Sequence, residues 1–344
     1  MRVLLIKTSS MGDIIHTLPA LTDAGKAIPD IQFDWVVEES FAEIPHWHSL
    51  VDEVIPVALR RWRKGIFSQP TRLEWRHLRQ QLKANHYDLI LDAQGLVKSA
   101  FLTFFSEGKR VGLDWSSARE PLASLAYQRK YSVNFYQHAI VRMRSLFSQA
   151  LGYTHDAAAL DFGLNKKIFH HAHQENYLVF LHGTTWVTKL WPEMYWQQLA
   201  TIAATAGFRI KISGGNDEEV ARAKRIAEQN EFVDVMPRLS ILEMAKLLAN
   251  AKGAVAVDTG FGHLAAALNI PTISLYGSTN SDYTGALGQS SLHLATQFAC
   301  SPCLSRTCTY REQREVTPAC YTSLKPDRVW AAIQKMLTDP LHHS

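Results

Sequence analysis

A carboxylate, several hydroxyls and a glycine follow the first apolar run of the chain, in residues 7–13 (KTSSMGD). Ser10 is a favoured helix N-cap, and the helix dipole favours an Asp in the first turn by about 0.3–1 kcal/mol. One interpretation is therefore a capped helix start. The other is that the same dipole keeps Asp13 ionised as a base for an acceptor hydroxyl. The spacing alone leaves both open.

Residues 182–189 (HGTTWVTK) supply the groups that a diphosphate needs. Thr184 and Thr185 are hydroxyls, Lys189 is an ammonium, and Pro192 suits the start of a following helix. Hydroxyls, backbone N–H groups and an ammonium at a helix N-terminus all bind phosphate oxygens. Such residues are common in loops, so it is their position directly after an apolar run that favours a binding site.

Residues 257–263 (VDTGFGH) repeat this arrangement of a strand, a tight turn and a helix start. The glycines let the backbone approach a ligand closely, and the new helix offers N–H groups to phosphate oxygens. The candidate residues here are Asp258, Thr259, Gly260 and His263. For His263 a buried structural role is the alternative.

Glu219 ends the acidic stretch of residues 214–219 (GGNDEE), after another apolar run. A carboxylate at this place binds ribose hydroxyls in many open sheets, although simple helix capping explains it equally. The chain has no GxGxxG after its first strand and no GxxxxGK[ST]. Both absences argue against a dinucleotide dehydrogenase and a P-loop phosphotransferase.

The elements that must position these residues are strands alternating with helices. We expect strands over residues 2–7, 33–37, 88–91, 177–181, 208–212, 254–257 and 272–276, and helices from about residues 12, 192, 217, 240, 262 and 327. This alternation predicts parallel sheets with right-handed crossovers, which bind ligands beyond the carboxyl ends of the strands. The predicted fold class is therefore α/β, with two Rossmann-like doubly wound domains facing a central cleft.

A chain of 344 residues favours two domains. We expect an N-terminal domain over residues 1–160, a linker over 161–176, a C-terminal domain over 177–325, and a final helix within 326–344 that packs back toward the first domain. The histidines of the linker, His170, His171 and His173, are interpreted as solvated and not as a metal site.

The composition is that of an ordinary folded protein, with 47% hydrophobic and 20% charged residues. The start of the chain does not resemble a signal peptide, and no run reaches the roughly 18 apolar residues of a membrane-spanning helix. We therefore expect a cytoplasmic protein whose membrane contact, if any, is peripheral. The net charge of +4 is modest, but four basic residues gather within residues 60–64.

Together these segments resemble the lipopolysaccharide heptosyltransferases of glycosyltransferase family 9, over nearly the whole chain. The segments most similar to heptosyltransferase I are KTSSMGDIIHTLPAL, FDWVVEE, VALRRWRK, DAQGLVKSA and SAREPLASLAY. The resemblance implies a GT-B fold and transfer of L-glycero-D-manno-heptose from ADP-heptose to the Kdo residue of Kdo₂-lipid A. It also implies inversion at the transferred sugar and a reaction without metal or cofactor.

The resemblance assigns the roles by motif. Asp13 is the base that deprotonates the acceptor hydroxyl, and Gly12 admits the sugar in the same turn. The donor is bound through its diphosphate by Thr184, Thr185 and Lys189, through its ribose by Glu219, and through its heptose and distal phosphate by Asp258, Thr259, Gly260 and His263.

The acceptor carries carboxylates and phosphates, so the resemblance assigns to it a cationic stripe in the first domain. The stripe with its adjoining hydroxyl comprises Ser10, Arg60, Arg61, Arg63, Lys64, Lys98, Arg119, His138 and Arg142. Trp62 and Phe67 are expected to touch acyl chains or the cytoplasmic face of the inner membrane. From the residues alone, a solvated face or a nucleic-acid patch are the alternatives, and the resemblance implies no nucleic acid.

The C-terminal segment departs from the heptosyltransferase I pattern through Cys300, Cys303, Cys308 and Cys320. Four thiols in one short segment are one form of structural zinc site. Because the spacing is not a standard pair of knuckles, and because disulfides are rare in the cytosol, we favour reduced and unliganded cysteines. This departure leaves the identity of the acceptor more open than the chemistry.

Three rival functions remain at this point. Heptosyltransferase II or III would share the donor residues and act on a later inner-core acceptor. UDP-sugar 2-epimerases share the fold, but the early Gly-Asp turn argues against them. A non-enzymatic module that binds lipid A or nucleic acid would leave Asp13, Lys189 and Asp258 unexplained.

Overall fold

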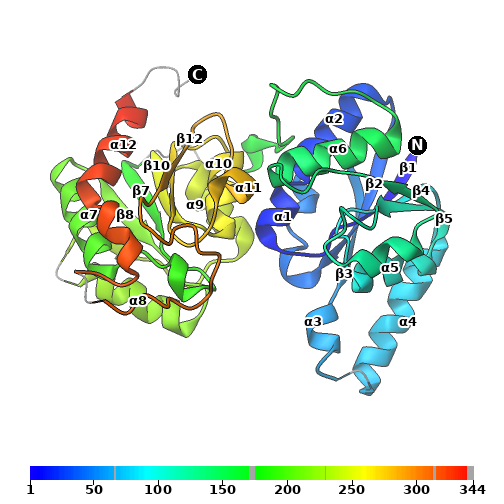
Figure 1. Cartoon of the computed structure of the whole chain (residues 1–344), viewed down its shortest axis with the longest axis horizontal. Helices are drawn as coiled ribbons and strands as arrows, with labels where there is room; N and C mark the ends of the chain where they lie inside the picture. The colour runs from blue at the N-terminus through cyan, green and yellow to red at the C-terminus, as the bar shows by residue number, and fades with distance from the viewer. Residues whose placement is uncertain (66, 170–174, 229, 313–314, 339–344) are drawn as a thin grey trace. The chain divides into compact units, whose positions relative to one another are not determined.

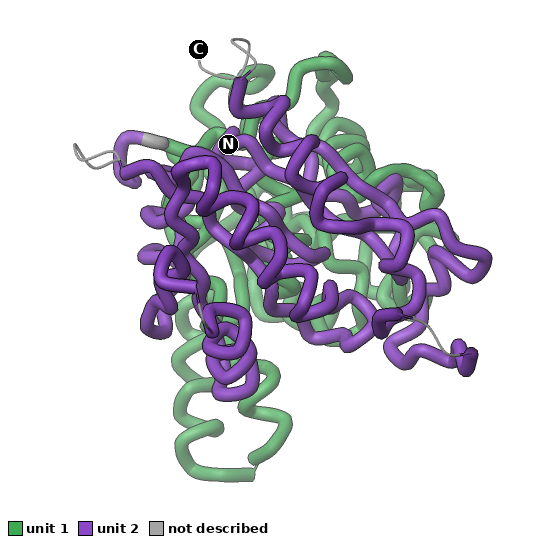
Figure 2. The backbone as a smooth tube through the Cα atoms, turned by 90° about the vertical axis from the view of Figure 1, so that its left-hand side faces the viewer, with its two compact units in different colours: residues 1–165 green, residues 166–344 purple. Residues whose placement is uncertain are grey.

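The computed structural model describes residues 1–65, 67–169, 175–228, 230–312 and 315–338. The chain divides into two compact units, residues 1–165 and 166–344, coloured separately in Figure 2. The three histidines expected in the linker lie outside the described residues.

The first unit is built on a six-stranded parallel sheet with the order β3-β2-β1-β4-β5-β6 (Figure 1). Its strands are β1 (Arg2–Ile6), β2 (Gln32–Glu38), β3 (Val51–Val57), β4 (His86–Asp92), β5 (Glu107–Leu113) and β6 (Arg129–Tyr131). Its helices are α1 (Met11–Ile15), α2 (Leu18–Ala27), α3 (Leu59–Trp62), α4 (Gln69–Ala84), α5 (Val97–Leu102) and α6 (Ala139–Leu151), with the short 3₁₀ turn η3 (Thr103–Phe105).

The second unit repeats the plan with the order β12-β11-β10-β7-β8-β9, again all parallel. Its strands are β7 (Tyr177–Leu181), β8 (Arg209–Ile212), β9 (Val233–Val235), β10 (Gly253–Val257), β11 (Thr272–Tyr276) and β12 (Ser291–Ala295). Its helices are α7 (Glu193–Thr205), α8 (Asp217–Ala227), α9 (Ile241–Ala249), α10 (Gly260–Ala267), α11 (Ser281–Thr284) and α12 (Pro326–Thr338). Counted from its own first strand, each sheet has the order 3-2-1-4-5-6 of a doubly wound fold.

The expected strands and helices are confirmed to within a few residues. A central strand of a parallel sheet is covered on both faces, which is why β1 and β7 are continuous apolar runs and not alternating ones. Ser240 and Glu243 form the predicted capping box at the start of α9. Helix α10 begins at Gly260, two residues before the expected start, because Thr259 is its extended N-cap residue.

The C-terminal helix α12, for which we expected packing toward the first domain, belongs to the second unit. Its apolar residues Val329, Ile333 and Met336 are part of that unit's core, beside α7, β10 and β11. An amphipathic helix buries its apolar face in a core, here the cluster that also contains Trp196. Within the described part of the chain, no helix is both long and apolar enough to cross a membrane.

Candidate active site

Three of the predicted site residues follow strands at the point of each sheet where the strand order reverses. This point falls between β1 and β4 in the first unit and between β7 and β10 in the second. Loops leaving such a pair of strands run in opposite directions and open a crevice, which is where open parallel sheets bind ligands. Asp13 follows β1, Lys189 follows β7 and Asp258 follows β10.

In the first unit, the loop after β4 holds the loop that carries Asp13. The Gln94 side-chain oxygen accepts hydrogen bonds from the backbone N–H groups of Thr8 at 3.0 Å and Ser9 at 3.1 Å. The Lys7 ammonium donates to the carbonyl of Ala93 at 2.9 Å. The two loops at the switch point are therefore tied together by buried polar contacts.

Asp92, the last residue of β4, anchors the loop that carries Gln94. Its buried carboxyl accepts from the Tyr127 hydroxyl at 2.7 Å, the Ser99 hydroxyl at 2.8 Å and the Gln94 N–H at 2.8 Å. Burial raises the pKa of Asp92, although these hydrogen bonds work in the opposite direction. The carboxyl is fully occupied by the fold, so its role is to position the loop.

Asp13 lies in the first turn of α1 and is partly buried. One of its oxygens, Oδ2, accepts hydrogen bonds from both the N–H and the hydroxyl of Ser10, each at 2.8 Å. Burial would raise the pKa of Asp13, but the charge of Lys7 and the two Ser10 hydrogen bonds outweigh it and the pKa is lowered. Asp13 is thus an ionised carboxylate held by its own turn.

Two further cations act on Asp13. The charge of Arg119 helps to lower its pKa, and the Asp13 carboxylate in turn acts on Arg142. Burial lowers the pKa of Arg142, whose Nε is buried without a hydrogen-bond partner among the described residues. The His138 ring stacks edge-on against His16, at the end of α1, with 5.4 Å between centroids. The structure therefore gathers Arg119, Arg142 and His138 around α1, whose N-cap residue Ser10 is a fourth predicted acceptor residue.

The other members of the predicted stripe are in different surroundings. Arg61 forms ion pairs with Glu39 and Glu74, each at 3.0 Å, so its charge is already compensated. The Arg60 guanidinium lies 5.6 Å from the centroid of the Phe41 ring. Arg63, Lys64 and Lys98 are exposed and form no ion pair with the described residues. Their part in acceptor binding stays a prediction.

The expectation that Trp62 touches a membrane is wrong. Only 8% of Trp62 is exposed, because it packs against Trp75, with 5.2 Å between ring centroids, and belongs to the core of the first unit. Phe67, five residues on, is 82% exposed and remains available.

In the second unit, Asp258 organises a buried polar cluster. Its carboxylate forms an ion pair with the Lys189 ammonium at 2.7 Å and accepts from the Thr279 hydroxyl at 2.8 Å. The His263 ring nitrogen Nε2 lies 3.9 Å from the same carboxylate. The Lys189 ammonium also lies 4.6 Å from the centroid of the Trp186 ring, which fixes its position further.

Helix α10 and the loop after β7 meet beside this cluster. The Thr184 hydroxyl donates to the Asp258 carbonyl at 3.1 Å, whereas Thr185 is exposed. The side chain of Thr259, the N-cap residue of α10, makes no capping hydrogen bond. The Gly262 N–H already donates to the Thr259 carbonyl at 3.0 Å, so the N–H groups of Gly260 and Phe261 are the ones that this helix start offers to an anionic ligand.

The Glu219 carboxylate reaches back to the end of β7. It accepts from the Gly215 N–H at 2.8 Å, and a Cβ at Gly183 would lie 2.7 Å from its carboxyl carbon. Any side chain at Gly183 would displace it. The N–H of Glu219 is capped by the Asn216 side chain at 2.9 Å, so the carboxylate itself is not needed as a cap.

The four cysteines line one small cavity in the second unit. Cys300, Cys303 and Cys308 are exposed, and Cys320 is buried. Burial and the three neighbouring thiols raise the pKa of Cys320 to about 11. As the side chains stand, no three His, Cys, Asp or Glu residues within the described ranges are placed to hold a metal ion.

Sequence reasoning missed four residues of these clusters: Lys7, Asp92, Gln94 and Thr279. A signal existed for the first three, since Lys7 and Asp92 are charged residues at the ends of apolar strands and Gln94 lies in the DAQG segment. Thr279 lies in the loop after β11, and only the packing of three strand ends brings it to Asp258.

Comparison with known proteins gives consistent matches. Residues 75–313 match the model of glycosyltransferase family 9 (heptosyltransferase). The chain is 53% identical to lipopolysaccharide heptosyltransferase 1 of Pseudomonas aeruginosa, over 99% of both chains, and 52% identical to that of Salmonella typhimurium, over 88% of this chain and 95% of the relative. Among solved structures, E. coli heptosyltransferase WaaC with ADP superposes with a TM-score of 0.88 and 44% identity, over 98% of this chain and all of that one.

Proposed function

The chain belongs to glycosyltransferase family 9, the heptosyltransferases, and from that premise we propose that it transfers L-glycero-D-manno-heptose from ADP-heptose to the Kdo residue of Kdo₂-lipid A. The relatives that support this reaction are named lipopolysaccharide heptosyltransferase 1, and two of the similar structures contain ADP or ADP-2-deoxy-2-fluoro heptose. The alternative within the family, heptosyltransferase II or III activity, differs in the acceptor.

The observation that carries the proposal is the Asp13 carboxylate, kept ionised by Lys7 and Ser10. In the reaction the acceptor hydroxyl oxygen attacks the anomeric carbon of the heptose, and its proton passes to Asp13. The bond from that carbon to the distal phosphate oxygen breaks, and ADP leaves from the opposite face, which inverts the configuration. Asp13 is a weak base in the ground state, but the hydroxyl becomes acidic as its bond to carbon forms.

Arg119 and Arg142 are the cations best placed to receive the anionic acceptor. Both are close enough to Asp13 for their charges to interact with it, and the buried Nε of Arg142 lacks a partner within the described residues. A Kdo carboxylate bound by these guanidiniums would bring its sugar hydroxyls to Asp13. Arg61 is a weaker candidate, because Glu39 and Glu74 already compensate its charge.

The second unit supplies the donor site. Lys189, the Thr184 hydroxyl and the first N–H groups of α10 would bind the diphosphate and stabilise the charge that develops on the leaving ADP. Glu219, held over Gly183, would accept from the ribose hydroxyls, and His263 with Asp258 would contact the heptose. Because the Lys189 ammonium, held by Asp258, and a helix N-terminus offer N–H donors to the diphosphate, we propose a reaction without a catalytic metal. The cysteine cavity remains a candidate for structural zinc, with free thiols favoured.

An acceptor with lipid acyl chains places the reaction at the cytoplasmic face of the inner membrane. We therefore propose a cytoplasmic protein that associates peripherally with that membrane.

The test is transfer from ADP-heptose to Kdo₂-lipid A by the purified protein in the presence of EDTA. Wild type and the control Asp161→Ala, which removes an exposed carboxylate paired with Lys26, should both transfer heptose, whereas Asp13→Ala should not. Transfer that disappears with EDTA would contradict the metal-independent mechanism. No transfer by wild type, but transfer to an acceptor that already carries heptose, would identify a later inner-core enzyme.

A further inference from the structure

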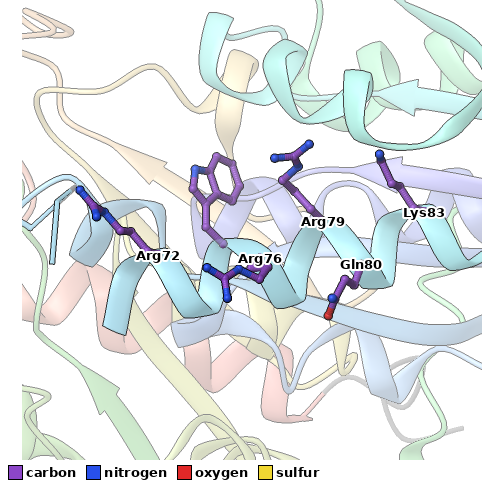
Figure 3. Close-up of a pocket in the computed structure, with 6 residues that line it drawn as sticks. Arg72, Arg76, Arg79, Gln80 and Lys83 are labelled. Carbon is purple, nitrogen blue, oxygen red and sulfur yellow. The ribbon is translucent and has the colours of Figure 1, made fainter. Parts of the chain in front are cut away.

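Helix α4 carries a row of cations along one face. Arg72, Arg76, Arg79 and Lys83 follow one another at steps of four, three and four residues, the spacing that places side chains on one side of a helix. We call these four residues the α4 basic face. All are exposed, and with Trp75 and Gln80 they line an open hollow of about 320 Å³. In Figure 3, Arg79 and Lys83 point to the same side of the helix.

No carboxylate compensates this charge. Among the described residues none of the four cations forms an ion pair, and the nearby Glu74 is already engaged by Arg61 and by the Trp62 ring N–H. Like charges three and four residues apart destabilise an isolated helix. Repulsion within this row therefore destabilises α4, and an anionic partner would relieve that repulsion.

Apolar side chains accompany the basic face. Trp75 lines the same hollow and contacts Phe101 and Phe105, with 6.2 and 5.5 Å between ring centroids. The Arg79 guanidinium lies 5.3 Å from the centroid of the Phe105 ring. Phe101 is 51% exposed, Leu73 on α4 is 43% exposed, and Phe67 in the turn before α4 is 82% exposed.

The position of these residues in the fold leaves them accessible from outside the unit. In Figure 1, α3 and the beginning of α4 extend beyond the sheet of the first unit. Arg72 and Lys83 are eleven helical steps apart, which is about 16 Å of helix at 1.5 Å per residue. An extended row suits a surface that carries many negative charges, whereas a single phosphate needs donors that converge on one point.

We propose that the α4 basic face, together with Phe67, Leu73 and Phe101, docks the protein on a bilayer of anionic phospholipids. Cations attracted by the lipid phosphates, beside aromatic and aliphatic side chains that enter the headgroup region, are the chemistry of interfacial binding. A nucleic acid would use the cations but would leave the exposed Leu73 without a partner. This inference rests on the proposed function, because a lipid-anchored acceptor requires the enzyme at the membrane, and it names the surface that meets the lipid.

The experiment is co-sedimentation of the full chain with vesicles of phosphatidylethanolamine and phosphatidylglycerol, compared with vesicles of phosphatidylcholine. The double variant Arg72→Gln with Arg76→Gln should bind the anionic vesicles about 25-fold more weakly, since each cation near such a surface contributes about fivefold. A matched control, Lys224→Gln with Lys335→Gln, removes the same charge from exposed helix positions of the second unit and should bind as wild type does.

Two further measurements separate docking from other effects. The double variant should unfold at the same temperature as wild type or at a higher one, because it relieves repulsion within α4. Its transfer to a soluble, deacylated acceptor should be unchanged, so that a failure of docking is distinguished from a failure of the proposed function. Phe67→Ser should weaken vesicle binding at high salt, where charge is screened.

The proposal is overturned if wild type binds phosphatidylcholine as tightly as anionic vesicles, or if the double variant and wild type bind the anionic vesicles equally. Loss of affinity for the soluble acceptor in the double variant would assign the basic face to the acceptor's own phosphates. Tight binding of wild type to an oligonucleotide, without binding to vesicles, would assign it to nucleic acid.

Discussion

Asp13 and Asp258 occupy corresponding places in the two units but have opposite surroundings. Each follows a strand at the switch point of its sheet. Asp258 is in direct contact with an ammonium, at 2.7 Å from Lys189, and also accepts from Thr279. Asp13 forms no ion pair within 4 Å among the described residues, and its cations, Lys7 and Arg119, act through charge at longer range.

The difference shows how one residue type serves two tasks. A carboxylate in direct contact with a cation holds that cation in place, which suits a residue that positions Lys189 for a diphosphate. A carboxylate that is held by Ser10 through Oδ2 and stabilised by distant charges remains ionised without a direct cation contact that would block access by a proton donor. We therefore propose that the first unit serves proton transfer and that the second unit binds the charged donor.

The largest expected effect distinguishes the two carboxylates. Asp13→Asn should lower kcat by about 10²- to 10⁴-fold, the usual contribution of a general base, and leave the affinity for ADP unchanged. Asp258→Asn should instead weaken ADP binding, because Lys189 loses the partner that holds it. Steady-state kinetics and calorimetric titration with ADP measure the two quantities. A large loss of ADP affinity in Asp13→Asn would reverse the assignment of the two units.

The next largest expected effect is the loss of folding stability at low pH, which can be compared between the cores of the two units. Among the described residues, one buried histidine of each unit has a pKa lowered from 6.5 to about 4, mainly by burial: His48 in the first unit and His182 in the second. Between these values the unfolded chain binds the proton more readily, so stability is complete above pH 6.5 and falls as the pH drops toward 4. Each histidine should contribute up to about 3 kcal/mol to this fall.

Thermal unfolding at a series of pH values measures that slope. His48→Gln and His182→Gln should each flatten it, whereas His46→Gln, which replaces an exposed histidine two positions from His48, should not. If both buried variants kept the wild-type slope, the two histidines would not be the groups that titrate.

The smallest expected effect is a shift in the pH dependence of kcat. It measures how far the charge of Lys7 keeps the Asp13 carboxylate ionised. Lys7→Met removes the cation whose charge lowers the pKa of Asp13. The pKa should rise, so the acid limb of kcat should move to higher pH. Lys26→Met removes the same charge from an exposed ion pair with Asp161 and is the control. An unmoved acid limb in Lys7→Met would mean that Ser10 alone keeps Asp13 ionised.

Much of this molecule could be predicted because the informative patterns are local. Strands such as β7 and β11 are apolar runs between helix signals, and their bounds were predicted to the residue. The capping box at Ser240 depends on two side chains three positions apart. The four candidate segments follow strands directly, so the order of elements along the chain places them at one edge of each sheet.

The contacts that define the site could not be predicted, because they join residues far apart in sequence. Gln94 reaches Thr8 and Ser9 across 86 and 85 positions, and Thr184 reaches Asp258 across 74. The misplacement of Trp62 has the same origin. Its basic neighbours favoured a surface position, but the apolar contact with Trp75 determined its burial.

The sequence by itself determined the two α/β units, the loops in which the reactive groups lie and the family to which they point, since these depend on periodicity and on motifs that neighbouring residues complete. The tertiary structure decided which carboxylate is paired and which remains accessible. It also decided which cations surround Asp13 and which are compensated by acidic neighbours, because the electrostatic environment of a group is set by distances through space and not by separation along the chain.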